Sequence, residues 1–140
     1  MEPVELLEAA KQARGNAYTP YSNFRVGAAL LTKDGRIFLG ANVENSSYGA
    51  TICAERSALA AAVSSGARSF AAIAIVGAPG GEKADAPCPP CGICRQVMSE
   101  FCGPDFPVYL ADGHGGVQKH QLGDLLADSF SGTRLRAKDK

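Results

Sequence analysis

Two short segments carry residue types that bind metal ions. One is Cys53-Ala54-Glu55-Arg56, and the other is Pro90-Cys91-Gly92-Ile93-Cys94. Both fall at the start of a predicted helix that follows a strand or a loop. In a βαβα unit such helix starts meet at one edge of the sheet, so three thiolates can converge on one ion. Zinc favours sulfur ligands and tetrahedral geometry, and three protein ligands leave the fourth position open for water.

Glu55 and two further cysteines decide what such a zinc site does. Glu55 follows the first cysteine by two residues and is badly placed to share the ion, so we predict that it carries protons. Spacing alone also allows a structural four-sulfur site, with Cys88 or Cys102 as the fourth ligand, because Cys88-Pro89-Pro90-Cys91 is itself a CxxC motif. We expect Cys88 to be a spectator thiol and Cys102 to be a core or partly buried thiol.

Hydrophobic periodicity and turn residues predict the elements that position these segments. Helices are predicted at 3–17, 52–65, 92–102 and 120–127, and strands at 24–32, 36–43, 70–78 and 108–110. Asp34-Gly35 supplies a hairpin turn, Thr51 is the expected cap of the second helix, and Gly66 is its expected stop. Right-handed crossovers then make the last strands parallel in a mixed sheet with helices on its faces.

Composition limits the class of protein. The 140 residues suit one domain spanning 1–140, in which we expect residues 131–140 to form a flexible tail. Fourteen basic and fourteen acidic residues give a net charge of zero, which disfavours a nucleic-acid partner. No apolar run reaches the length of about 20 residues that a membrane helix needs. The first residues lack the pattern of a secretory signal, so we expect a cytoplasmic protein with reduced cysteines.

Several segments in order resemble the short cytidine deaminase family. The strongest are Asn42-Val43-Glu44-Asn45, Tyr48-Gly49, Thr51-Ile52-Cys53-Ala54-Glu55-Arg56 and Pro90-Cys91-Gly92-Ile93-Cys94-Arg95-Gln96, with Pro20-Tyr21-Ser22-Asn23-Phe24 and Val26-Gly27-Ala28-Ala29 before them. The resemblance implies a three-layer α/β/α fold with a mixed, mostly five-stranded sheet. It also implies hydrolytic deamination of cytidine and 2′-deoxycytidine to uridine and 2′-deoxyuridine, with release of ammonia, in pyrimidine salvage.

The resemblance assigns roles at the metal site. Cys53, Cys91 and Cys94 bind one zinc ion per chain, and Glu55 moves protons between the attacking water and the pyrimidine ring. Three thiolates donate much charge to the ion, and in the family Arg56 offsets this by donating hydrogen bonds to sulfur.

The resemblance also assigns the substrate contacts. Asn42 and Glu44 bind the ribose hydroxyls, and a carboxylate at this position favours a nucleoside over a nucleotide. Phe24 stacks on the pyrimidine, and the backbone at Ala54 recognises the edge of the base.

Two further residues are assigned across subunit boundaries. In the homotetrameric family, residues matching Tyr48 and Phe130 reach an active site that subunits share. The Phe130 assignment departs from the family pattern, because Leu125-Leu126-Ala127 stands where the family has Leu-Leu-Pro.

Three alternatives compete with this assignment. An antibiotic deaminase of the blasticidin type is expected to lack the Asn42 and Glu44 pair. A nucleic-acid deaminase conflicts with the zero net charge and with Cys53, where many such enzymes have histidine. A structural zinc module that binds protein explains the cysteines but leaves Glu55 without a role.

Overall fold

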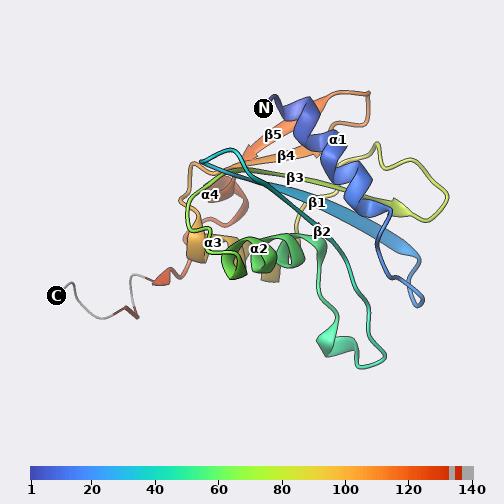
Figure 1. Cartoon of the computed structure of the whole chain (residues 1–140), viewed down its shortest axis with the longest axis horizontal. Coiled ribbons are helices and arrows are strands. Elements are labelled where there is room, and N and C mark those ends of the chain that lie inside the picture. The colour runs from blue at the N-terminus through green and yellow to red at the C-terminus, as the bar shows by residue number, and fades with distance from the viewer. Residues whose placement is uncertain (133–134, 137–140) are drawn as a thin grey trace.

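The computed structural model describes residues 1–132 and 135–136, and its centre is a five-stranded mixed sheet (Figure 1). The strand order is β2-β1-β3-β4-β5, with only β3 and β4 parallel among neighbours. The strands are β1 Phe24–Thr32, β2 Ile37–Ala41, β3 Phe70–Pro79, β4 Pro107–Ala111 and β5 Val117–Gln121. The helices are α1 Pro3–Arg14, α2 Ala54–Ser64, α3 Gly92–Phe101 and α4 Leu122–Leu125, with a short 3-10 helix, η1, at Tyr48–Ala50.

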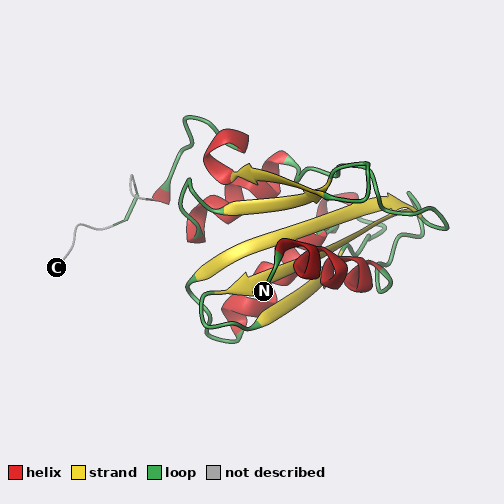
Figure 2. Cartoon of the chain, turned by 90° about the horizontal axis from the view of Figure 1, so that it is seen from above, coloured by secondary structure: helices red, strands yellow, loops and turns green. Residues whose placement is uncertain are grey.

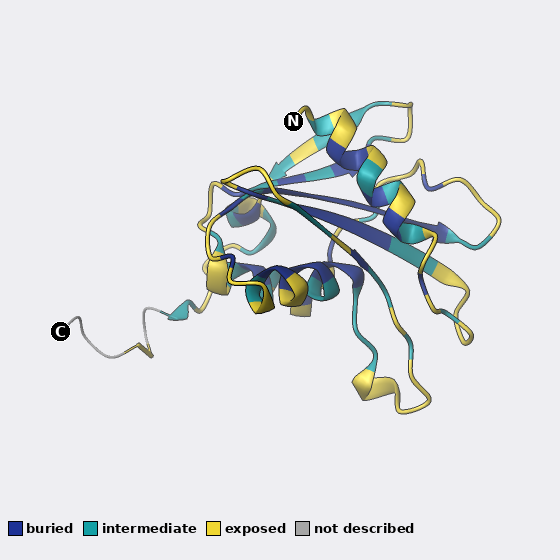
Figure 3. Cartoon of the chain, viewed as in Figure 1, coloured by how far each residue is buried: buried dark blue, intermediate teal, exposed yellow. Residues whose placement is uncertain are grey.

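The sheet separates two apolar cores, which makes the three layers. Helix α1 packs on one face, while α2 and α3 cover the other (Figure 2). Successive side chains of a strand point to opposite faces, so Ile73 and Ile75 of β3 pack toward α2 and α3, whereas Ala74 and Val76 pack toward α1. Figure 3 shows that the central strands are buried along most of their length. The predicted three-layer α/β/α class is therefore confirmed.

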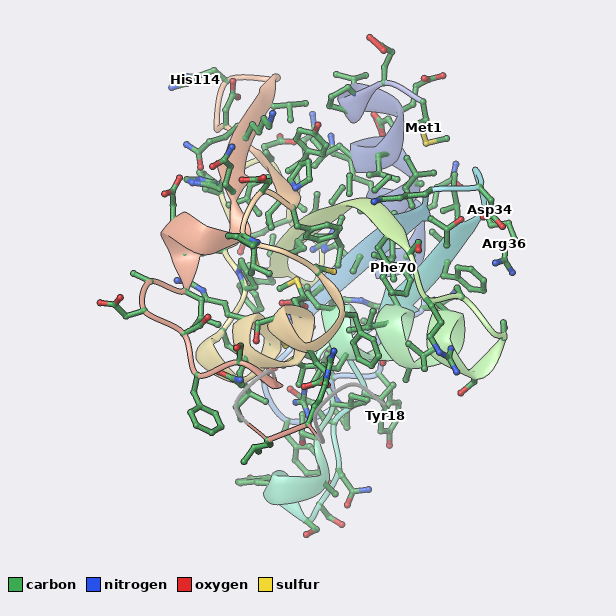
Figure 4. All side chains as sticks on the ribbon, turned by 90° about the vertical axis from the view of Figure 1, so that its left-hand side faces the viewer. Met1, Tyr18, Asp34, Arg36, Phe70 and His114 are labelled. Atoms are coloured by element: carbon green, nitrogen blue, oxygen red, sulfur yellow. The ribbon has the colours of Figure 1, made fainter. Side chains whose placement is uncertain are left out.

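The β1–β2 hairpin turns where the sequence predicts. Gly35 adopts φ +91°, a conformation that favours glycine. Asp34 and Arg36 form an ion pair at the exposed tip of the hairpin, with 3.2 Å between Asp34 Oδ2 and Arg36 Nε (Figure 4). The turn makes β2 antiparallel to β1, so the last residue of β2, Ala41, lies opposite Gly27 near the start of β1.

Two local predictions were wrong. The predicted helix at 120–127 is reduced to α4, and His120 lies in β5 opposite Val108. The β5 sequence contains one apolar residue, so it lacks the hydrophobic pattern that indicates a strand. Thr51 does not cap α2, because an antiparallel bridge between Val43 and Ile52 keeps this segment extended and leaves Cys53 at the cap position. Of the predicted flexible tail, residues 133–134 and 137–140 lie outside the described residues.

Close backbone packing fixes α2 against the sheet. A Cβ atom on Gly40 of β2 would lie 2.3 Å from the carbonyl oxygen of Ala54, the first residue of α2. The missing side chain lets the start of α2 rest directly on β2. No helix in the described residues is long and apolar enough to cross a membrane.

Candidate active site

The start of α2 and the start of α3 bring three sulfur atoms together. Cys53 precedes α2, Cys91 precedes α3, and Cys94 lies in the first turn of α3. The Sγ atoms of Cys53 and Cys91 are 3.8 Å apart, those of Cys91 and Cys94 are 3.6 Å apart, and all three lie within 4.8 Å of one another. Among the described residues this is the only cluster with ligand geometry, and it excludes Cys88 and Cys102.

The surroundings of these sulfurs fit a zinc ion. A hydrogen bond from Cys94 and another from Arg56 lower the pKa of the Cys53 thiol to about 5, and zinc binds the thiolate form. The Nη2 atom of Arg56 lies 3.6 Å from Cys53 Sγ, and its Nε is buried with no hydrogen-bond partner in the described part of the chain. The two helix starts also favour negative charge. Thiolates that are stabilised in this way are soft ligands, and zinc favours such ligands.

Glu55 is buried beside the sulfur cluster but is not part of it. Only 4% of its surface is exposed. Burial, and secondarily the charge of Cys53, raises the pKa of the Glu55 carboxyl to about 7. A carboxyl group with that pKa exchanges protons readily near neutral pH.

A cavity of about 300 Å³ opens next to Glu55 and the sulfurs. Its lining residues are Ser22, Phe24, Val26, Asn42, Glu44, Thr51, Ile52, Cys53, Ala54, Glu55, Cys88, Pro89 and Cys91. The predicted base and ribose contacts therefore share one cavity with Glu55 and two of the predicted ligands. Its lining does not include Cys94, Arg56, Tyr48 or Phe130.

Asn42 is anchored to the start of β1. Its Oδ1 accepts a hydrogen bond from the Val26 backbone N–H at 2.9 Å, and its Nδ2 donates to the Phe24 carbonyl at 2.8 Å. These bonds extend the pairing of β1 beyond the end of β2. The second Nδ2 hydrogen remains available for a ligand.

Glu44 is anchored to the loop before β1. Its Oε1 accepts hydrogen bonds from the backbone N–H groups of Tyr21, at 2.9 Å, and Ser22, at 3.1 Å. Its Oε2 accepts a hydrogen bond from the Ser22 hydroxyl. Together these donors, led by the hydroxyl, lower the pKa of Glu44, so the group is ionised at neutral pH. Sequence reasoning missed Ser22 as a site residue, although the Pro20–Phe24 motif contains it.

Cys88 forms part of the cavity wall. A Cβ atom on Gly77 would lie 2.6 Å from Cys88 Sγ and 3.1 Å from Phe24 Cε2, so Gly77 makes room for both side chains. Burial, and then the charges of Glu55 and Cys53, raises the pKa of the Cys88 thiol to about 11. Cys88 is therefore a neutral thiol that shapes the cavity without joining the sulfur cluster.

Tyr48 and Phe130 lie on exposed segments. Tyr48 belongs to η1, on an arm between β2 and α2 that projects from the body of the molecule (Figure 1). It is 73% exposed, and its ring lies 5.7 Å from that of Tyr21. Phe130 is 59% exposed, and its carbonyl accepts a hydrogen bond from Gln96 Nε2 at 2.8 Å.

Comparisons with known proteins agree with this geometry. Residues 2–110 match the family described as the cytidine and deoxycytidylate deaminase zinc-binding region. The chain belongs to this deaminase family. A cytidine deaminase of Halalkalibacterium halodurans is 50% identical over 131 residues, which cover 94% of this chain and 96% of the relative. A probable cytidine deaminase of Dictyostelium discoideum is 46% identical over 94% of this chain and 86% of the relative.

Solved deaminase structures share the fold. The crystal structure of cytidine deaminase from Burkholderia pseudomallei has a TM-score of 0.84 and 53% identity, and the alignment covers 93% of this chain and all of that one. That from Mycobacterium tuberculosis has a TM-score of 0.77 and 40% identity over 93% of this chain and 98% of that one. The family match ends within β4, so β5, α4 and Phe130 lie beyond it. Zinc is thus the metal indicated both by the deaminase family and by the sulfur cluster.

Proposed function

We propose that this deaminase hydrolyses cytidine and 2′-deoxycytidine to uridine and 2′-deoxyuridine with release of ammonia, in pyrimidine salvage. One observation carries the proposal: the buried Glu55 and the sulfur cluster open onto the same cavity as Asn42 and Glu44. A structural zinc module needs no such cavity and no buried carboxyl group. The identity to proteins named cytidine deaminase supports the same substrate. The cytoplasmic location stays a prediction.

In this proposal the chain's own residues divide the chemistry. Cys53, Cys91 and Cys94 hold zinc, which supplies the Lewis acidity that makes a water molecule nucleophilic at neutral pH. Glu55 accepts a proton from the attacking water and delivers it to ring nitrogen 3 as oxygen bonds to carbon 4. Glu55 then moves the remaining hydroxyl proton to the amino group. The bond from carbon 4 to nitrogen breaks, ammonia leaves, and the carbonyl of uridine forms.

The substrate contacts favour a nucleoside. Glu44 is ionised and lines the cavity, so it accepts hydrogen bonds from sugar hydroxyls and repels a phosphate group. Phe24 presents an aromatic ring for the pyrimidine, and the Ala54 backbone lies at the start of α2 beside Glu55. We therefore expect poor turnover of CMP. Efficient CMP turnover by the wild type contradicts this assignment of the cavity.

We propose a homotetramer with shared active sites. The outer side of α2 and α3 carries an apolar cavity of about 350 Å³, lined in part by Leu59, Val97 and Phe101, which offers a surface for a second copy. Tyr48, on its projecting arm, and Phe130 are exposed and are free to reach a neighbouring subunit. Light scattering combined with activity tests this assembly, and a fully active monomer contradicts the shared sites.

The decisive experiment compares the wild type with Glu55→Gln. The assay follows the ultraviolet loss of cytidine together with ammonia release, and cytosine, CMP and blasticidin are run alongside. Removing a positioned general acid/base costs about 10²–10⁴-fold in rate, and we expect the upper end because one group serves several transfers. The variant should retain zinc and bind cytidine. An inert wild type overturns the proposed function, and an active Glu55→Gln variant assigns the proton transfers to another residue.

A further inference from the structure

Ser22 connects the two side chains that are proposed to hold the two halves of the substrate. Its hydroxyl donates a hydrogen bond to Glu44 Oε2 at 2.5 Å and accepts one from the Phe24 backbone N–H at 2.9 Å. Ser22 also lines the cavity itself. One hydroxyl group therefore links the carboxylate on the ribose side to the aromatic residue on the base side.

The bonds around Glu44 leave it little freedom. A carboxylate offers about four lone-pair sites, and the loop before β1 occupies three of them through Tyr21 N–H, Ser22 N–H and the Ser22 hydroxyl. Both bonds to Oε1 come from the backbone, and they persist whatever side chain residue 22 carries. Within the described part of the chain the Ser22 hydroxyl is the one hydrogen-bond partner of Oε2, so it fixes which way the remaining acceptor site points.

Phe24 depends on the same hydroxyl. Its backbone N–H donates to Ser22 Oγ, while its carbonyl accepts from Asn42 Nδ2 at 2.8 Å. The residue is therefore held on both sides by groups of the cavity, although 41% of its surface is exposed. Loss of the Ser22 hydroxyl releases one of these two anchors.

We propose that Ser22 is a positioning residue for substrate binding, which aims Glu44 Oε2 at a sugar hydroxyl and holds Phe24 in place for the base. The inference rests on the proposed function, because it requires a nucleoside in the cavity. Ser22 lies on the sugar side and makes no contact with Glu55 or the sulfur cluster among its hydrogen bonds in the described residues. Its effect therefore falls on KM and leaves kcat nearly unchanged.

The test measures kcat and KM of Ser22→Ala and Ser22→Thr on cytidine and on 2′,3′-dideoxycytidine, which lacks the 2′ and 3′ hydroxyls and keeps the 5′ hydroxyl. Loss of a hydrogen bond to a charged group predicts a rise of about 10-fold in KM for cytidine with Ser22→Ala. On the dideoxy substrate the rise should fall to about threefold or less, because Glu44 Oε2 has no 2′ or 3′ hydroxyl to accept from. Ser22→Thr keeps the hydroxyl and should restore the KM. The matched control is Ser99→Ala. In the wild type the Ser99 hydroxyl donates to the Gln96 carbonyl, outside the cavity.

Each outcome bears on a different claim. An equal rise in KM for both substrates shows that Ser22 only supports the loop, and it overturns the inference. So does an unchanged KM in Ser22→Ala, or a loss confined to kcat. If Ser22→Ala fails to fold, Ser22→Thr and Ser22→Cys carry the comparison, since the thiol is a weaker donor. A wild type that turns over neither substrate overturns the proposed function itself.

Discussion

Replacing Gly40 with alanine tests how closely the chemistry depends on the seating of α2. The added Cβ atom would lie 2.3 Å from the Ala54 carbonyl oxygen and 2.5 Å from the Ala58 nitrogen. Both are backbone atoms, so no side-chain rotation relieves the contact. Either β2 or the start of α2 must move.

The size of the movement follows from these distances. An ordinary van der Waals contact begins at 3.4 Å, so the contact at 2.3 Å requires a displacement of about 1 Å. Ala54 lies between Cys53 and Glu55, and a movement of α2 therefore displaces the proposed metal ligand and the proposed proton carrier together. Misplacement by about 1 Å costs about 10²-fold in rate, and overpacking costs about 1–3 kcal/mol of stability.

Two control variants separate loss of activity from loss of stability. Gly27→Ala places a Cβ atom 2.1 Å from the Ala10 carbonyl oxygen, on the α1 face, so it should lower the unfolding temperature while kcat per folded molecule changes little. Gly103→Ala has no atom within 4 Å of the added Cβ and should behave as wild type. The assay measures kcat per zinc-loaded, folded molecule, alongside thermal unfolding.

Either of two results would contradict a dependence of the activity on the contact between β2 and α2. A Gly40→Ala variant with wild-type kcat would show that the site tolerates the displacement of α2. An equal loss of kcat in Gly27→Ala would show that the activity responds to the sheet as a whole and not to the contact between β2 and α2.

Three further predictions follow from the same structure. Metal analysis should find about one zinc per wild-type chain, with zinc lost in Cys94→Ala and retained in Cys88→Ala. The reverse pattern would show that the zinc site uses the Cys88–Cys91 motif and not the Cys91–Cys94 motif. Arg95 donates from Nε to the Pro90 carbonyl and from Nη1 to the Leu125 carbonyl, both at 2.7 Å. Arg95→Gln should therefore loosen the turn before Cys91 and release zinc to a chelator about 10-fold faster, and an unchanged rate would rule out this support. Burial raises the pKa of Cys102 to about 12, so iodoacetamide should label it slowly at neutral pH and faster in alkali, whereas rapid neutral labelling would show an exposed thiolate.

The sequence predicted those parts of the fold and site that local patterns encode. The Asp34-Gly35 turn, the buried β3 run and the paired cysteine motifs each carry a strong signal of their own. β5 was missed because Val117–Gln121 carries one apolar residue, and it forms a strand only because β4 offers an edge for pairing. The place of Ser22 was missed for a related reason, since its partner Glu44 lies 22 positions away in the chain. Tertiary contacts, which local patterns do not encode, decide such positions.

The topology explains why all these groups meet at one edge. β2 and β3 are both antiparallel to β1, so they run in the same direction and their carboxyl ends share an edge. Each is followed by a segment that leads to the start of a helix, α2 or α3, which brings the positive ends of two helix dipoles to the thiolates. β1 runs the opposite way, and therefore its first residue, Phe24, and the loop with Ser22 arrive at that same edge. The sulfur cluster, a buried carboxyl group and an aromatic wall thus come together at one edge of the sheet, although a projecting arm separates β2 from α2.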